Sequence, residues 1–172
     1  SQEKDNFYYH EFREGAVFQY RESPMELSVI APAECRNAPV ILFFHGGGHE
    51  TGTIGELPYG QSLEYAKRGI LLVSAGYRLN LFSLYRSRNY GLLDQMEAIS
   101  WVRRHIGDFG GDPDKITIMG QSAGAMSVMD LCLTQQLKGK VRGAVMMSGG
   151  GLVPRLACPI PEKKSAPFWD RV

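Results

Sequence analysis

Short apolar runs alternate along the chain with segments in which apolar residues recur at helical spacing. The apolar runs are rich in β-branched residues and contain few polar ones, which is typical of strands that helices cover on both faces. Strands are predicted at residues 40–44, 70–75, 116–119 and 141–147. Helices are predicted at residues 62–68, 94–102 and 123–133. This order predicts an α/β fold, with a mostly parallel central sheet and crossover helices on both faces.

The two ends of the chain depart from this pattern. Residues 25–30 alternate apolar and polar side chains, which predicts a half-buried strand at an edge of the sheet. Beyond Gly151, prolines interrupt any helix, and the chain finishes with large apolar side chains. We expect a single domain, in which residues 151–172 begin a lid or a connecting loop.

Charge and composition exclude several classes of function. The formal net charge of the 172-residue chain is +1, which lacks the basic excess of nucleic-acid-binding proteins, so we expect no nucleic-acid partner. No apolar run approaches the roughly 20 residues of a membrane span, and no signal segment opens the chain, so we expect no membrane association. The three cysteines form none of the close pairs that suggest a metal site. We expect no metal or cofactor, and reduced thiols favour the cytoplasm, although a secreted chain without its signal would look the same.

The pentapeptide at residues 120–124, Gly-Gln-Ser-Ala-Gly, carries the strongest chemical signal. The pattern Gly-x-Ser-x-Gly holds a serine on a strained turn between a strand and a helix, where its hydroxyl is exposed for nucleophilic attack. Alone it is weak, because about one random sequence in ten of this length would contain it. Its place between the predicted strand 116–119 and the predicted helix 123–133 makes it specific. We therefore predict that Ser122 is the nucleophile of a serine esterase with the α/β-hydrolase fold.

A second motif supports ester hydrolysis. The predicted helix after Ser122 directs free N–H groups at the serine, which favours the negative charge of acyl transfer. Residues 45–48, His-Gly-Gly-Gly, follow the predicted strand 40–44, where this fold places the other part of the oxyanion hole. A glycine loop can also serve packing or bind phosphate. However, no Gly-x-x-x-x-Gly-Lys-Ser/Thr motif or dinucleotide fingerprint is present, so nucleotide binding is excluded.

Together these motifs resemble the type-B carboxylesterase family, which includes bacterial carboxylesterases and the cholinesterases. The resemblance covers about residues 40–149. Its other matching segments are residues 77–80, 91–95, 101–102, 109–113, 116–118 and 148–149. The resemblance implies that the backbone N–H groups of Gly47, Gly48 and Ala123 bind the oxyanion. It also implies that Ser148 supports the triad by hydrogen bonding. Asp94 and Arg78 match positions expected to form a buried structural ion pair.

The catalytic triad is incomplete in this chain. A serine hydroxyl needs a histidine base and an acid, which in this fold follow the serine, yet no histidine follows Ser122. Asp130 lies about two turns into the predicted helix and is expected to point away from the serine. We infer that residues 1–172 are the amino-terminal part of a hydrolase domain. Its carboxyl-terminal half, a second chain or a missing segment, would bring the acid and the histidine. The alternative is a catalytically inactive binding or adhesion relative.

Two residues bear on the substrate, which we expect to be a small-molecule ester. His49 stands where the family often has an aromatic residue; it either lines the mouth of the acyl pocket or is solvated. Gln121 replaces the acidic residue that cholinesterases carry before their serine. A general ester is therefore favoured over a cationic choline ester.

Overall fold

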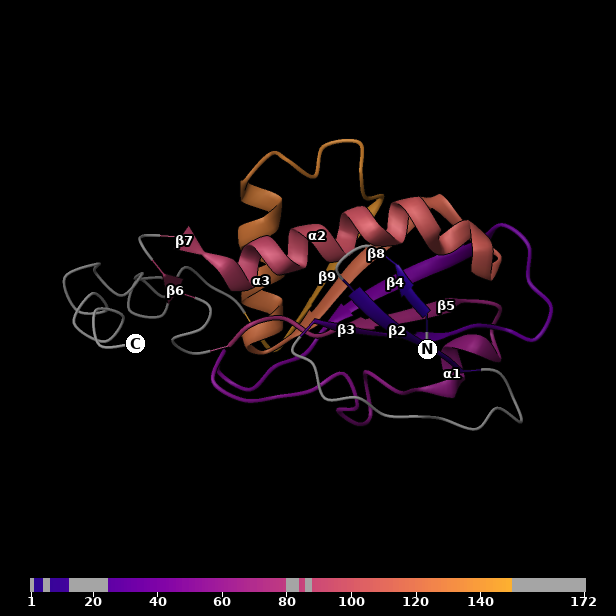
Figure 1. Cartoon of the computed structure of the whole chain (residues 1–172), viewed down its shortest axis with the longest axis horizontal. Coiled ribbons are helices and arrows are strands. Elements are labelled where there is room, and N and C mark those ends of the chain that lie inside the picture. The colour runs from indigo at the N-terminus through magenta and orange to yellow at the C-terminus, as the bar shows by residue number, and fades with distance from the viewer. Residues whose placement is uncertain (1, 5–6, 13–24, 80–83, 86–87, 150–172) are drawn as a thin grey trace.

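The central sheet was identified in a computed structural model, which describes residues 2–4, 7–12, 25–79, 84–85 and 88–149. It has seven strands in the order β1-β2-β3-β5-β4-β8-β9, and Figure 1 shows the helices packed around it. The strands of this sheet are β1 (Gln2–Lys4), β2 (Phe7–Phe12), β3 (Glu26–Ile30), β4 (Ala38–Phe44), β5 (Leu71–Ala75), β8 (Gly111–Gln121) and β9 (Gly143–Met147). A separate two-stranded ribbon consists of β6 (Leu84–Tyr85) and β7 (Arg88–Asn89).

The strands that carry the candidate site run parallel. β4 lies between β5 and β8 and is parallel to both, and β9 is parallel to β8. The antiparallel pairs are β1 with β2 and β3 with β5, which precede β4 in the strand order. The predicted α/β class, with a mostly parallel sheet, is therefore confirmed, although the sheet is mixed.

Helices cover both faces of this sheet. α1 (Leu63–Ala66) lies on one face, where Tyr65 and Ala66 pack on Phe43 and Leu72. α2 (Tyr90–His105), the 3-10 turn η2 (Ile106–Phe109) and α3 (Ala123–Leu133) pack together on the other face. In Figure 1, α2 and α1 lie on opposite sides of the strands. None of the described helices is long and apolar enough to cross a membrane.

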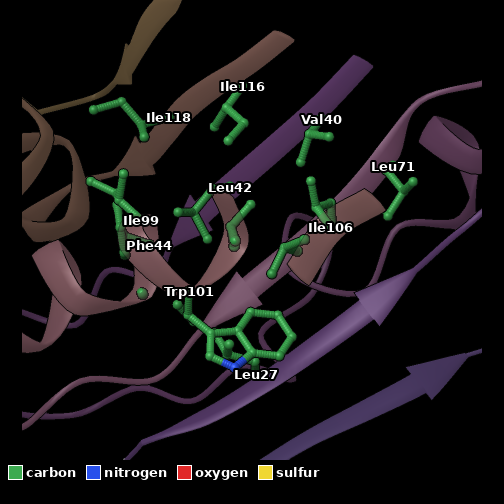
Figure 2. Packing of buried hydrophobic residues seen from close by; sticks show 14 of the residues in the cluster. Leu27, Val40, Leu42, Phe44, Leu71, Ile99, Trp101, Ile106, Ile116 and Ile118 are labelled. Atoms are coloured by element: carbon green, nitrogen blue, oxygen red, sulfur yellow. The ribbon is translucent and has the colours of Figure 1, made fainter. Parts of the chain in front are cut away.

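The main core lies between α2 and the sheet. Trp101 and Ile99 of α2 are fully buried against strand residues such as Leu42 and Ile118, as Figure 2 shows. Burial of each large apolar side chain contributes about 1.5–3 kcal/mol relative to its exposure. Burial is lower in β9, the last strand in the order of the sheet, where Val145 and Met146 are 42% and 46% exposed.

The prediction for residues 25–30 was wrong in one respect. They form a strand, β3, but all five of its residues are buried, and it lies between β2 and β5 instead of at an edge. Its polar side is covered by the segment before α1, since Gln61 Nε2 donates to Ser28 Oγ at 3.2 Å. Alternation shows which side of a strand is polar, but it does not show whether a distant loop covers that side.

Several boundaries also moved. α2 begins at Tyr90, four residues earlier than predicted, because the Asn89 side chain caps it and accepts from Leu92 N at 2.9 Å. β8 spans 11 residues instead of four, since Gly111 already pairs with Ala38 before a register shift. The helix predicted at residues 123–133 has the predicted ends. The expected lid or connecting segment, residues 151–172, lies outside the described residues.

Candidate active site

Ser122 occupies a sharp turn between β8 and α3. Its backbone angles are φ 53° and ψ −118°, a combination that costs a residue with a side chain about 1–3 kcal/mol. The turn is anchored to the next strand, because Ser122 N–H donates to the Met147 carbonyl at 2.8 Å. Among the described residues, no side chain forms a hydrogen bond with Ser122 Oγ. A strained, half-buried serine at a strand-to-helix turn is the geometry that the pentapeptide predicts.

The glycines of the pentapeptide permit close backbone packing. A Cβ on Gly120 would collide with the Gly124 carbonyl. A Cβ on Gly124 would in turn collide with the Phe44 carbonyl and lie 2.6 Å from the His45 carbonyl oxygen. Because these contacts are with backbone atoms, no side chain can move aside to relieve them.

We predict that Gly124→Ala lowers the free energy of unfolding of the intact protein by about 1–3 kcal/mol, since the added methyl group overpacks the contact with β4. Denaturant titration measures this change. Gly107→Ala is the matched control, because a Cβ on Gly107 meets no atom within 4 Å, and its effect should stay within about 0.5 kcal/mol. Equal stability of the two variants would contradict the close approach of α3 and β4.

The glycine loop after β4 lies directly against the serine turn. An ideal Cβ on Gly46 would lie 3.3 Å from Ser122 Cβ and 2.6 Å from Gln121 Oε1. The strands themselves are in register here, since Phe44 pairs with Gly120. The loop after β4 leads to α1 on one face, whereas the turn after β8 leads to α3 on the other. The two motifs therefore meet at a topological switch point, where open α/β sheets bind their ligands.

The loop has three consecutive residues with positive φ: Gly47 at 96°, Gly48 at 67° and His49 at 61°. It closes on itself, because the Gly47 carbonyl accepts from the N–H groups of Glu50 and Thr51 at 3.0 Å. Within the described part of the chain, no group accepts a hydrogen bond from the N–H of Gly47, Gly48 or Ala123. These donors are therefore available to a ligand beside Ser122.

His45 supports this loop from the interior. Its ring is buried and stacks on Tyr77 at 4.5 Å between ring centroids, and its Nδ1 lies 2.9 Å from the Gly46 carbonyl. Tyr77 O–H donates to the His45 carbonyl at 2.7 Å. Burial lowers the pKa of His45 and raises the pKa of Tyr77, so both rings are uncharged at neutral pH. Tyr77 was not predicted as a site residue, although it opens the matching segment 77–80.

His49 is half-buried, and its Nε2 lies 3.0 Å from Ser127 Oγ of α3. The alternative in which His49 is merely solvated is therefore wrong, whereas its place at the mouth of an acyl pocket stays a prediction. Burial lowers the pKa of His49, and burial raises the pKa of Asp130, which attracts His49 electrostatically. No described hydrogen bond or ion pair joins Asp130 to Ser122. Ser127 had no signal in the sequence that would have identified it.

The structure also describes Ser148, Asp94 and Arg78, the other residues singled out in the sequence. Ser148 follows β9 with φ 50° and is exposed; its supporting role stays a prediction. The expected ion pair is present, since Arg78 donates to the two carboxylate oxygens of buried Asp94 at 2.6 and 2.8 Å. Arg78 is one-third exposed and also lies 4.6 Å from the ring centroid of Tyr90. Across the described ranges, no group of three or more His, Cys, Asp or Glu could hold a metal ion.

Comparisons with known proteins agree with this geometry. Carboxylesterase 5A of Canis lupus familiaris is 36% identical over 151 residues, which cover 83% of this chain and 26% of that protein. Para-nitrobenzyl esterase of Bacillus subtilis (strain 168) is 38% identical over 137 residues, covering 74% of this chain and 28% of that enzyme. The solved structure of a PNB esterase superposes with a TM-score of 0.71 at 33% identity, covering 83% of this chain and 31% of that one. Its fold confirms the predicted α/β-hydrolase class.

The chain spans about a quarter of the length of these curated relatives. The model of the carboxylesterase family matches residues 2–167. The resemblance therefore reaches both ends of the chain, and the narrower extent predicted from the motifs, about residues 40–149, was wrong. Because the match covers nearly the whole sequence, the chain belongs to the carboxylesterase family.

Proposed function

We propose that this chain supplies the nucleophile and the oxyanion hole of a serine carboxylic ester hydrolase. The observation that carries the proposal is the position of the strained Ser122 turn against a glycine loop whose N–H groups have no acceptor among the described residues. A nucleophile and donors for the developing charge are the two elements that acyl transfer requires at one place.

In the proposed reaction, Ser122 Oγ attacks the ester carbonyl and its proton passes to a base. The carbonyl oxygen becomes an oxyanion, which accepts hydrogen bonds from the N–H groups of Gly47, Gly48 and Ala123. Collapse of this intermediate expels the alcohol, which takes the proton, and leaves Ser122 acylated. Water then attacks the acyl group and gives up a proton to the base. The base passes the proton to Ser122 Oγ, so that the carboxylic acid product leaves and the serine is restored. Ser148, just beyond the Met147 carbonyl that anchors the turn, supports this arrangement.

The base and its acid come from a carboxyl-terminal part of the same hydrolase, as a second chain or as a further segment. The two histidines near the turn are already engaged elsewhere. His45 Nδ1 lies against the Gly46 carbonyl, and His49 Nε2 lies against Ser127 Oγ. Neither forms a hydrogen bond with Ser122, so neither is placed as its base.

The substrate is a small, uncharged ester. Gln121 stands beside Ser122 with its amide oxygen toward Gly46, and it brings no negative charge that would attract a cationic alcohol group. Several relatives bear esterase names, among them the para-nitrobenzyl esterase, and this supports an ester as the substrate class.

Covalent labelling tests the proposal. The intact protein, in whatever chain composition it is isolated, is treated with an organophosphonate, and peptide mass spectrometry locates the adduct. We expect one label per protein, on the peptide that contains Ser122, because the attack on phosphorus uses the same nucleophile and oxyanion donors. A protein that stays unlabelled while an unrelated serine hydrolase in the same tube reacts would favour the inactive binding relative.

A further inference from the structure

His49 is the residue of the glycine loop whose backbone most needs support. It continues the positive φ angles of Gly47 and Gly48, with φ 61°, but unlike them it carries a side chain. Residues other than glycine rarely adopt this conformation and keep it only where surrounding contacts hold it. The conformation of His49 sets the direction in which the loop leaves Gly48, so whatever holds His49 also holds the N–H groups before it.

The contacts of the His49 ring all lie outside its own loop. Nε2 lies 3.0 Å from Ser127 Oγ of α3. Tyr77 meets the ring nearly edge-on, with 6.3 Å between centroids and an interplanar angle of 68°. Ser127 is only 4% exposed and lies one helical turn after Ala123. It is therefore a fixed partner and not a mobile surface group.

These contacts connect the two parts of the proposed oxyanion hole. Gly47 and Gly48 belong to the loop after β4, whereas Ala123 is the first residue of α3. The His49 ring reaches from the first part to the second. The Asp130 carboxylate of α3 acts to raise the pKa of His49, against the larger effect of burial, which lowers it.

We propose that His49 is a positioning residue, which holds Gly47 and Gly48 against the start of α3 and so fixes the spacing of the oxyanion donors. The proposal rests on the proposed function, because it assigns a role within that site. It does not make His49 a catalytic residue. The oxyanion forms only as the reaction proceeds. Displacement of the Gly47 and Gly48 N–H groups therefore destabilises the transition state and leaves ground-state binding of the ester unchanged.

Steady-state hydrolysis of a chromogenic aryl ester by the intact protein tests this role. His49→Asn is the main variant, because asparagine tolerates positive φ but is too short to reach Ser127. We expect kcat to fall about 10- to 100-fold, less than the full loss of one oxyanion donor, with KM within about twofold. His49→Gln, which can reach Ser127, should recover part of kcat. Cys132→Ser, on an exposed position of α3, is the matched control and should match the unaltered protein.

Ser127→Ala tests the same contact from the other side, with a substitution that α3 accepts readily. We expect a loss of kcat similar to that of His49→Asn. The kcat of the double variant should lie within about twofold of that of the slower single variant, because both changes remove the same contact. A kcat within twofold of the unaltered protein in both single variants would overturn the proposal. So would losses that multiply in the double variant, or a fall in kcat/KM that comes entirely from KM.

The outcome is separable from that of the proposed function. If the unaltered protein neither hydrolyses esters nor takes the organophosphonate label, the proposed function itself is wrong. If it does both and the His49 and Ser127 variants match it, only the positioning role is wrong.

Discussion

Ser122→Ala is expected to lower kcat for ester hydrolysis by the intact protein by about 10⁴- to 10⁶-fold. The hydroxyl is the only group proposed to bond to the acyl carbon, and without it no acyl-enzyme forms. The residual rate comes from the oxyanion donors and from binding alone, so KM should change little. Stopped assays with high enzyme concentration measure the residual kcat, and the organophosphonate label should disappear in parallel.

Ser100→Ala is the control for this change. Ser100 lies on α2, where its hydroxyl donates to the Met96 carbonyl at 3.0 Å, away from the serine turn. Its kcat should equal that of the unaltered protein. If Ser122→Ala keeps more than about a tenth of the activity, the assignment of Ser122 as nucleophile is wrong and another residue carries the acyl group.

Trp101→Ala is expected to reduce the free energy of unfolding by about 3–5 kcal/mol. The indole is fully buried in the main core, in ring contact with Phe109 and His105, and Figure 2 shows it within the same group of side chains as Leu27 and Phe44. Its removal loses the transfer free energy of the ring and leaves a cavity that the surrounding strands cannot fill. Denaturant titration of the intact protein gives the value.

Leu93→Ala is the matched control on the same helix. Leu93 is 44% exposed on α2, so truncation there should change the free energy of unfolding by less than about 1 kcal/mol. Similar losses in the two variants would mean that α2 does not present Trp101 to the core as described.

The order of the elements from β3 onward, except for the ribbon of β6 and β7, could be predicted from the sequence because each signal is local. The strands β1 and β2 were not predicted. The apolar run at residues 40–44 indicates a covered strand, and the pentapeptide with its flanking strand and helix indicates the serine turn. The ends of α3 agreed with the composition of residues 123–133. The start of α2 was missed although its signal is also local, since Asn89 is a common helix cap.

What could not be predicted depends on residues that are distant in the sequence. The burial of β3 follows from Gln61, 33 residues away from Ser28, which covers its polar side. The contact between His49 and Ser127 joins residues 78 positions apart, and no pattern of types or spacings announces it. Residue types showed that a glycine loop and a serine turn were both present, but only the fold shows what holds them together.

The register between β4 and β8 has a consequence for how the site comes into existence. Phe44 pairs with Gly120, so the last rungs of this ladder set the loop and the serine beside each other. A slip by one residue would displace them by about 3.3 Å and turn alternate side chains to the opposite face of the sheet, which the buried core forbids. The proposed nucleophile, Ser122, and the glycine loop are therefore brought together by the register of the two central strands. Unpairing of β4 and β8 would separate the loop from the serine, whereas loss of the contact between His49 and Ser127 would change only the spacing within the site.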